Sequence, residues 1–584
     1  MVYSGLTLVS RMMGFVRDLV ISYAMGASAT FAADAFNTAF AFPNLFRRIF
    51  AEGAFAAAFV PAYSKALEQD GEEKADILAA DAMAALAAIT VVLTVVAELA
   101  MPWLMYAIAP GFASTPAKFK LAILLTQITM PYLPCMAIYA HLSGVLNARN
   151  RFVLSAGAPI LLNIWTLVTV LPAHTPVGAA EAASVGVLIA GLSQWALLHW
   201  GVRKSGARVD WRWPRLTPEI RALIGRAVPG AAAASATQVN IFISGILVSQ
   251  VNGARSWLAA ADRLYQLPLG LVGVAIGVAL LPRLSRAVHA SDGSAAQGAM
   301  DEAITFSLAF TLPAAAALSA IPVFLIDGLY TRGQFTSFDA LQTGHALFFY
   351  GLGTPAFVLA QLYSRAFFAR QDTKSPMRFA LISVAVNIIV GVTLVRLVGF
   401  QGIAAATSIA AWLNVAQMAF ALSRRGDYRP SAKAWSRVAR ILVSCLVLAG
   451  LLATAAHFRA AIEAPFAGFR IGRVVGPKEF AILLTVLGGA VLYPPLLFLS
   501  GGLKLAEVRS ALRRRPAESL DAEIEQDLGK TPAGPDLALA WALALFRAHA
   551  TDAEDSQAMA GREPALNPAR AAARVAFLML RSEK

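Results

Sequence analysis

The chain carries little charge and almost no cysteine for its length. Of its 584 residues, 14% are charged and 58% are hydrophobic. A soluble domain carries about 25% charged residues, so this composition excludes an ordinary soluble protein. The two cysteines, Cys135 and Cys445, both lie in apolar stretches, and they imply no disulfide framework.

The sequence also lacks the motifs of common enzyme classes. Its seven histidines are dispersed, and no pair has the spacing of metal ligands. It contains no GxxxxGK[ST] loop, no HExxH motif, no triad pattern and no paired acidic cluster suited to Mg²⁺-diphosphate chemistry. We therefore expect that the protein is not an enzyme, and that it has neither a cofactor nor a metal site.

What the chain does have is long hydrophobic runs. A bilayer core of about 30 Å needs about 20 apolar residues per helix. We therefore expect an all-α polytopic membrane protein with about fourteen transmembrane helices. The candidate spans are roughly 4–26, 34–64, 77–109, 118–148, 154–173, 182–202, 221–251, 256–288, 298–330, 339–369, 376–398, 402–423, 435–457 and 479–501.

The formal net charge of +14 lies mostly in short loops between the spans, which argues against nucleic-acid binding. An even number of spans places both ends of the chain on one side. The loops on that side hold most of the loop lysines and arginines, among them Lys65, Lys74, Arg149, Arg151, Arg203, Lys204, Arg208, Arg212, Arg215, Arg424 and Arg425. The positive-inside rule then predicts an inner-membrane protein with both termini in the cytoplasm.

The chain repeats itself at an offset of 221 residues. Residues 60–64 match 281–285, Pro134 matches Pro355, and residues 143–150 match 364–371. This register relates spans 1–6 to spans 7–12 as a parallel repeat, which is a recurrent transporter plan. The alternative is an old duplication kept for packing.

The repeat sets the expected domains. We expect an N-lobe at 1–215 and a C-lobe at 216–430, pseudo-symmetric and of six helices each. Two extra helices follow at 431–510, and a loosely ordered cytoplasmic tail at 511–584.

Five arginines lie inside or at the edges of the spans: Arg11, Arg17, Arg47, Arg48 and Arg263. A charge at mid-bilayer costs about 2.5–3.5 kcal/mol on insertion scales. Such residues usually face a bundle interior or a watery cavity. Five arginines with few acids nearby predict a cavity for an anion.

On the second span, Asn44, Arg48 and Glu52 follow i, i+4, i+8 spacing and share a helix face. Glu52 can partly neutralise Arg48, which leaves the neighbouring Arg47 as net positive charge. Pro43 can kink this helix. The alternative is that both arginines extend to the membrane interface without lining a cavity.

On the first span, Arg11 and Arg17 flank Gly14, which allows bending or close packing. Asp18 can pair with Arg17, whereas Arg11 has no acid near it in sequence. We expect Arg11 to face a ligand and Arg17 to act as a gate or structural pair.

On the eighth span, Asp262 and Arg263 are expected to form a pair. Gln266 shares a face with Arg263, and it cannot carry a proton.

These motifs resemble those of the MurJ (MviN) family of bacterial lipid II flippases, in the MOP exporter superfamily. The resemblance covers about residues 1–510 and rests on residues 10–18, 34–36, 42–55, 60–61, 261–264 and 270–275. It implies two six-helix lobes in a V shape, with two further helices forming a groove for the lipid tail.

The resemblance also implies the site. Arg11, Arg17, Arg47, Arg48 and Arg263 match arginines that are important in the family, and Asp34 matches an important aspartate. We count Asp34 and Asn44 with these arginines as substrate-binding, and Gly14, Asp18, Glu52, Asp262 and Gln266 as gating or ion-pair residues. An acid sometimes found in the family at the Gln266 position is absent. The candidate ligands on spans 7 and 11, Gln238, Asn240 and Asn387, include no acid, so we do not expect a sodium site.

The implied substrate is undecaprenyl-pyrophosphate carrying the peptidoglycan disaccharide-pentapeptide, with cell wall synthesis proteins as further partners. Guanidinium groups suit pyrophosphate oxygens. An inside-negative potential drives an anion outward with about 2.3 kcal/mol per charge per 100 mV. The alternatives are an exporter of another polyprenyl-linked glycan or a drug, and a transport-inactive membrane scaffold.

Overall fold

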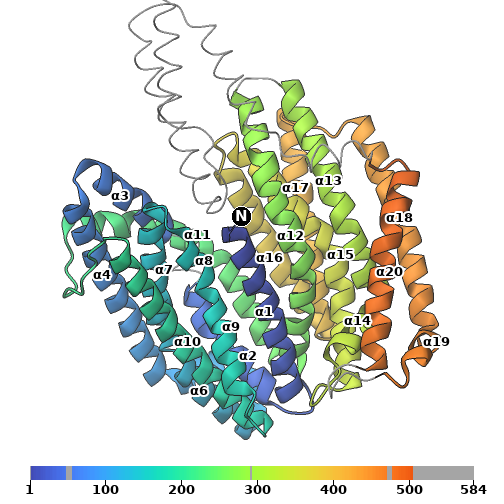
Figure 1. The fold of residues 1–584 in the computed structure, drawn as a ribbon, viewed down its shortest axis with the longest axis horizontal. Helices are drawn as coiled ribbons and strands as arrows, with labels where there is room; N and C mark the ends of the chain where they lie inside the picture. Colours follow the sequence, from blue (N-terminus) through green and yellow to red (C-terminus); the bar gives the residue numbers. More distant parts are fainter. Residues whose placement is uncertain (1, 48–54, 290–292, 470–475, 504–584) are drawn as a thin grey trace, which may run out of the picture. The chain divides into compact units, whose positions relative to one another are not determined.

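The structure, a computed structural model, describes residues 2–47, 55–289, 293–469 and 476–503. Throughout these ranges the regular structure is helical (Figure 1). The expected tail at 511–584 lies outside the described residues. The longer helices are α1 (Val2–Met25), α2 (Ala32–Arg47), α3 (Phe55–Gln69), α4 (Glu72–Leu99), α6 (Pro116–Thr129), α7 (Tyr132–Ala148), α9 (Pro159–Val170), α10 (Pro176–Lys204), α11 (Pro218–Val248), α12 (Ala254–His289), α13 (Gly293–Ala320), α15 (Ser337–Phe368), α16 (Lys374–Val398), α17 (Gln401–Arg425), α18 (Ala432–His457) and α20 (Pro477–Leu499).

Within the described residues, ten helical segments are long and apolar enough to cross a membrane. The other four expected crossings are α1, the α2–α3 pair, α11 and α12. Consecutive crossings alternate between two sides of the bundle. We call the side where α1 begins the near side, and the side with the loops at 26–31, 109–115, 249–253 and 331–336 the far side. The expected all-α polytopic architecture is confirmed.

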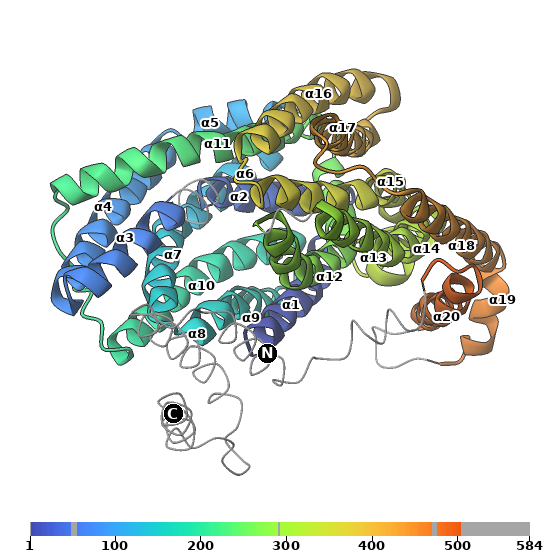
Figure 2. The same ribbon diagram turned by 90° about the horizontal axis from the view of Figure 1, so that it is seen from above.

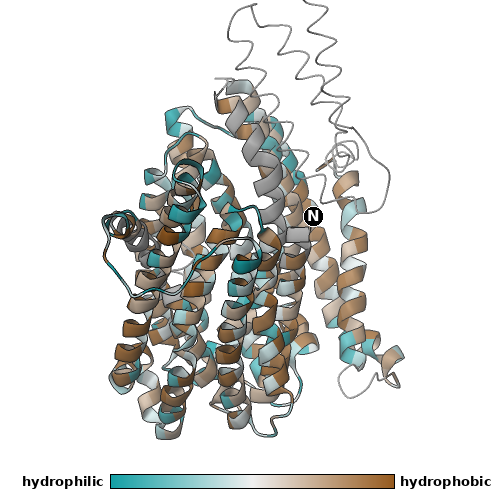
Figure 3. Ribbon diagram, turned by 60° about the vertical axis from the view of Figure 1, so that its left-hand side comes forward, coloured by the Kyte–Doolittle hydropathy of each residue, from teal (hydrophilic) through white to brown (hydrophobic). Residues whose placement is uncertain are grey.

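Shorter helices complete the connections. On the far side these are α5 (Met101–Ile108), η2 (Pro110–Ser114), α14 (Pro322–Tyr330), α19 (Arg459–Glu463) and η3 (Ala464–Phe466). On the near side, α8 (Phe152–Gly157) precedes α9. Figure 3 shows hydrophobic residues along the helices and hydrophilic residues concentrated in the loops, as a lipid-embedded bundle requires.

The expected repeat is visible in the helix ends. Moving α4 by 221 positions gives the ends of α13, and moving Pro116 and Lys204 gives Ser337 and Arg425, the start of α15 and the end of α17. Asn150 and Gln371, also 221 apart, both have positive φ angles, 58° and 60°. Two halves of the chain therefore fold by the same plan.

Separate cores hold the two halves. Two apolar clusters draw on residues between Ile21 and Leu223, and a third draws on residues between Leu284 and Tyr428. We call α1–α10 the N-lobe and α12–α17 the C-lobe (Figure 2). The helix α11 joins them, because it contacts α3 and α4 as well as α16.

The first turns of α11 pack on the N-lobe, although the expected domain boundary at 215/216 assigns them to the C-lobe. Ile220 and Leu223 are 1% and 4% exposed and belong to an apolar cluster of the N-lobe. These two residues are three apart and therefore lie on one helix face. Burial of that face fixes the first turns of α11 on the N-lobe, although the repeat counts α11 with the second half.

On the near side, Asp76 of α4 ties three elements together. Its carboxylate accepts hydrogen bonds from Tyr63 at 3.1 Å, from Arg149 at 3.0 Å and from the backbone N–H of Arg208 at 2.6 Å. Tyr63 also accepts a bond from Arg149 Nε at 2.8 Å. Because Asp76 is 7% exposed, these donors offset the cost of burying its charge.

The last two crossings, α18 and α20, pack on each other, and they contact α13 and α14 respectively. Tyr493 donates a hydrogen bond to Ala309 O at 2.6 Å. At the far side, Arg459 and Lys478 bond to Asp327 of α14. Burial alone would raise the pKa of Asp327, but the hydrogen bond from Arg459 and the positive charges of Arg459 and Lys478 hold that pKa below its usual value.

The contacts of Asp76 predict that replacing this aspartate destabilises the protein more than replacing an exposed aspartate. Asp76→Ala leaves the largely buried Arg149 without its buried counter-ion and should lower the free energy of unfolding by about 3 kcal/mol. Asp210→Ala breaks only an exposed contact with Arg203 at 3.9 Å and should cost less than about 1 kcal/mol. Thermal unfolding of both variants in the same detergent checks this, and equal melting temperatures would contradict it.

Candidate functional site

A cavity of about 110 Å³ lies between the two lobes. Its walls come from α1, α2, α9 and α10 on one side and from α12 and α14 on the other. Three charged residues line it, Arg17 and Asp18 of α1 and Arg263 of α12, together with Asn37 and Tyr330. The charged lining joins residues about 245 positions apart in the chain.

Asp18 is shared by two arginines from different lobes. Arg17 donates from Nε and Nη2 to Asp18 Oδ1, at 3.0 and 2.7 Å. Arg263 pairs through Nε with Asp18 Oδ2. The Arg17 side chain is only 10% exposed, so its charge depends on this carboxylate. These three residues carry a net charge of +1.

Asp262 and Arg263, which were expected to form a pair, each have a further partner in the structure. Arg263 reaches across to Asp18, while Gln266 donates a hydrogen bond to Asp262. Successive helical residues point about 100° apart, so neighbours in sequence face different partners. Gln266 is thus a hydrogen-bond partner of Asp262.

Arg11 lies where α1 meets α12. Its side chain is exposed, and its guanidinium lies so close to Gly270 that a Cβ built there would be 1.6 Å from Nη1. Gly14 is less tightly packed: its nearest neighbours, the Asn163 side-chain atoms, would be 3.7–3.8 Å from an added Cβ. A methyl group would fit there, so the expected close contact at Gly14 is of ordinary van der Waals kind.

The span-2 site is only partly within the described residues. Asn44 donates from Nδ2 to Phe40 O at 3.0 Å, one turn earlier in α2. Arg48, Glu52 and the side chain of Arg47 lie outside the described residues. Their shared face remains a prediction.

Asp34 occupies a different place from the substrate-binding position that the sequence predicts. It is fully buried at the far side and is not among the cavity-lining residues. Lys118 of α6 donates to it at 2.7 Å, and the C-lobe donates the N–H of Gly253 at 2.8 Å. Ser256 adds its N–H at 3.1 Å and its hydroxyl at 2.8 Å. Asp34 therefore joins the lobes.

A second buried carboxylate does the same from the other lobe. Asp339 of α15 is fully buried and accepts the N–H of Ser28 of the N-lobe at 3.0 Å. It also accepts Trp257 Nε1 at 2.8 Å. Asn252 strengthens the junction, because it accepts a bond from Lys118 at 3.0 Å and donates to Ser28 O at 3.0 Å.

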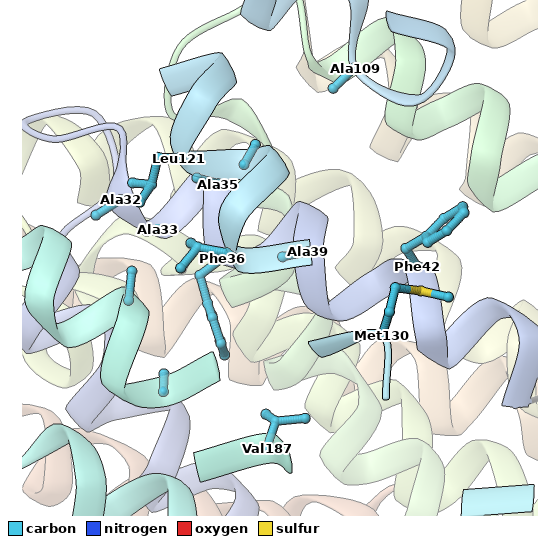
Figure 4. Packing of buried hydrophobic residues seen from close by; sticks show 14 of the residues in the cluster. Ala32, Ala33, Ala35, Phe36, Ala39, Phe42, Ala109, Leu121, Met130 and Val187 are labelled. Carbon is cyan, nitrogen blue, oxygen red and sulfur yellow. The ribbon is translucent and has the colours of Figure 1, made fainter. Parts of the chain in front are cut away.

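We call Asp34, Lys118, Asn252, Ser256 and Asp339 the far-side gate. The backbones also approach closely here: Gly26 and Gly333 have φ angles of 69° and 56°, and an added Cβ would lie 2.5 Å and 2.4 Å from carbonyl oxygens of the opposite lobe. Ala32, Ala33, Ala35 and Ala39 of α2, next to Asp34 in sequence, are at most 2% exposed, and Figure 4 shows them in a packed apolar cluster. The structure is closed on the far side.

Sequence reasoning missed Lys118, Asn252, Ser256 and Asp339, although the repeat held a signal for two of them. A shift of 221 positions relates Asp34 to Arg255 and Lys118 to Asp339. Each of these four residues stands within the first turn of its helix at the far side. Comparing charged residues at the starts of the spans across the repeat would have identified these two pairs. In each pair the matching positions of the two halves carry opposite charges.

Two lobes of membrane-crossing helices, with a charged cavity between them and a closed gate on one side, define a polytopic membrane transporter. A solved multidrug resistance MATE transporter of the MOP superfamily in an inward-facing conformation has a similar fold, with a TM-score of 0.58 and 14% identity over 73% of this chain and 97% of that one. The family model of the lipid II flippase MurJ matches residues 21–466. The chain belongs to the lipid II flippase MurJ family.

The matches to individual relatives extend over most of the length of each relative. A probable lipid II flippase MurJ from Rhizobium tropici is 39% identical over 525 residues, which covers 89% of this chain and 97% of the relative. The lipid II flippase MurJ of Burkholderia cenocepacia is 33% identical over 463 residues, covering 77% and 88%. A solved lipid II flippase MurJ in an inward closed conformation has a TM-score of 0.70 at 24% identity, over 85% of this chain and 98% of that one.

The far-side gate predicts how one hydroxyl affects access to the cavity. Ser256→Ala removes a hydrogen bond to a buried carboxylate and one from Asn37 at 3.3 Å. The open population should rise on the order of tenfold. The measurement is labelling of Ser22→Cys, a cavity residue, by a membrane-impermeant maleimide applied from the far side; both native cysteines are buried.

The matched control is Ser114→Ala. Ser114 lies on the same side, but its hydroxyl bonds only within its own turn, to Gly111 O at 2.8 Å. Its labelling rate should equal that of the parent. If Ser256→Ala also leaves the rate unchanged, the polar contacts of Ser256 do not hold the gate.

Proposed function

We propose that the protein moves lipid II, the undecaprenyl-pyrophosphate-linked peptidoglycan precursor, from the cytoplasmic to the outer leaflet of the inner membrane by alternating access. The observation that carries the proposal is the Arg17–Asp18–Arg263 cluster in the cavity between the lobes. The names of the family and of its relatives support the same substrate.

The cluster suits a pyrophosphate group. Both guanidiniums have N–H groups in a planar fork that matches phosphate oxygens. In the structure one carboxylate, Asp18, occupies donors from both arginines. A pyrophosphate that entered the cavity would compete with Asp18 for these donors and would draw Arg17 and Arg263, one from each lobe, onto a single ligand. Substrate binding is thereby coupled to the distance between the lobes.

In this proposal the near side is cytoplasmic and the far side faces out. The near-side loops contain most of the basic loop residues, which supports this orientation through the positive-inside rule. The closed far-side gate then corresponds to a state that takes up substrate from the cytoplasmic side. Opening it would require the C-lobe donors of Gly253 and Ser256 to leave Asp34, while Lys118 of the N-lobe remains with it.

The chief alternative is an exporter of cationic drugs, since a MATE transporter shares the fold. A cation would require an acidic cavity. The described lining has two arginines and one aspartate, with that aspartate bonded to both arginines. The charge of the cavity favours an anion.

Arg263 gives the direct test. Arg263→Ala leaves Asp18 paired with Arg17, so the protein should insert at its normal level. It removes the C-lobe half of the cluster, so complementation of a flippase-depleted strain should be lost. Arg263→Lys should complement only weakly, because lysine lacks the planar fork. The readout is externally accessible lipid II per unit of membrane protein.

The control is Arg221→Ala, which removes an exposed arginine at the near-side start of α11. It should support normal growth. Full export by Arg263→Ala would refute the role of the cluster. Loss of export by both variants would point instead to general charge effects.

The driving force is a second testable part of the proposal. Gln266 cannot carry a proton, and it donates a hydrogen bond to Asp262, the acid nearest to it in sequence. An anionic headgroup responds to the membrane potential by about 2.3 kcal/mol per charge per 100 mV. Export into the outer leaflet should therefore stop when the potential alone is dissipated, and continue when the proton or sodium gradient is collapsed at constant potential. Export at zero potential that follows an ion gradient would contradict this.

A further inference from the structure

The segment that joins the lobes, residues 205–217, is held on the N-lobe with its large apolar side chains outward. It follows α10 and forms neither helix nor strand between residues 207 and 217. Ala207 and Val209 are 1% and 2% exposed and belong to the N-lobe core, and the N–H of Arg208 bonds to Asp76 at 2.6 Å. The backbone of this linker is therefore fixed against the N-lobe.

Beyond these anchors, three large apolar side chains point away from the protein. Trp211, Trp213 and Leu216 are 62%, 84% and 69% exposed. Two tryptophans this exposed are unfavourable in water but favourable at the headgroup level of a bilayer, where an apolar ring and a polar N–H both find partners. The linker joins the near-side ends of two membrane crossings, α10 and α11, so it lies close to that level.

The same segment is strongly basic. Residues 203–216 contain five basic residues, Arg203, Lys204, Arg208, Arg212 and Arg215, against one acidic residue, Asp210. Its two ion pairs are long, at 3.9 Å, from Arg212 to Asp81 and from Arg203 to Asp210. Lys204 Nζ lies 4.9 Å from the ring of Trp200, a further tryptophan that is 53% exposed. Exposed tryptophans and basic residues thus follow one another closely along this segment.

The repeat shows that this feature is not required by the architecture. A shift of 221 positions takes Trp211 and Trp213 to Ala432 and Ala434, which lie in the first turn of α18. The C-lobe therefore continues into a helix at the point where the N-lobe presents its two tryptophans. Packing of the two lobes does not account for these side chains.

We propose that residues 200–216 form a binding surface for anionic phospholipid in the near-side leaflet. Trp211, Trp213 and Leu216 insert among the headgroups, and Arg208 and Arg215 bind lipid phosphates. Each basic residue close to an anionic leaflet strengthens association by about fivefold. With the orientation proposed above this leaflet is the cytoplasmic one, but the surface requires only an anionic leaflet and is independent of what the cavity transports.

The test uses the full chain in nanodiscs of one composition, a mixture of phosphatidylcholine and phosphatidylglycerol, with brominated acyl chains on one lipid or the other. Bromine quenches tryptophan on contact. Subtracting the fluorescence of Trp211→Phe/Trp213→Phe from that of the parent isolates these two of the ten tryptophans. The difference signal should be quenched at least about twofold more by brominated phosphatidylglycerol than by equal brominated phosphatidylcholine.

Two variants separate charge from insertion. Arg208→Gln/Arg215→Gln should bring the quenching ratio towards one while both lipids still quench, and unchanged melting would show that the fold is intact. Trp103→Phe reports on a tryptophan that is 72% exposed in α5, on the far side, and its difference signal should show no preference. A parent signal quenched by neither lipid places the tryptophans in water or on a protein partner, and equal quenching means no anionic preference. Either result overturns the proposal.

Discussion

A carboxylate buried between two lobes cannot remain unpaired, and the closed state of this protein depends on that constraint. Asp34 has no exposed surface, and an isolated charge in such a place would cost several kcal/mol. Its own lobe supplies Lys118, but Gly253 and Ser256 of the other lobe supply three of its four hydrogen bonds. Separation of the lobes must replace those bonds with water. Among the described residues, these bonds hold the two lobes together at the far side.

The same constraint applies to the positive charges in the cavity, because a buried arginine also needs a partner. Arg17 and Arg263 are tolerated inside the bundle because Asp18 bonds to both. In the proposed mechanism an entering anion would take over from Asp18, so the arginines would keep a partner with and without substrate. Gate and cavity share the pattern of one carboxylate with donors from both lobes, and each can exchange a partner without leaving a buried charge alone.

The length of the hydrophobic runs was enough to predict the helices, and the 221-residue register predicted the common plan of the halves. The structure adds that Asn150 and Gln371, at matching positions of the repeat, both have positive φ angles. The five arginines in the spans predicted a cavity for an anion, and two of them, Arg17 and Arg263, line the cavity in the structure. What the sequence could not provide was the partner of each charge. Arg263 was expected to pair with adjacent Asp262, and the structure adds Asp18 of the other lobe as its partner. Asp34 was predicted as a substrate-binding residue, and the structure shows it buried with hydrogen bonds from both lobes. These contacts between the lobes join residues more than 200 positions apart, and only the packing of the lobes decides them.

The central claim, that Asp34 holds the lobes together at the far side, is tested most directly by a distance between them. Spin labels are attached at Trp103→Cys in the N-lobe and Phe338→Cys in the C-lobe, two exposed positions on that side. Double electron–electron resonance in nanodiscs then gives the distribution of the distance between the two labels. The parent should show one narrow distribution. Asp34→Ala, which leaves the C-lobe donors without an acceptor, should add a population at longer distance. An unchanged narrow distribution in that variant, with the fold intact, would contradict the account.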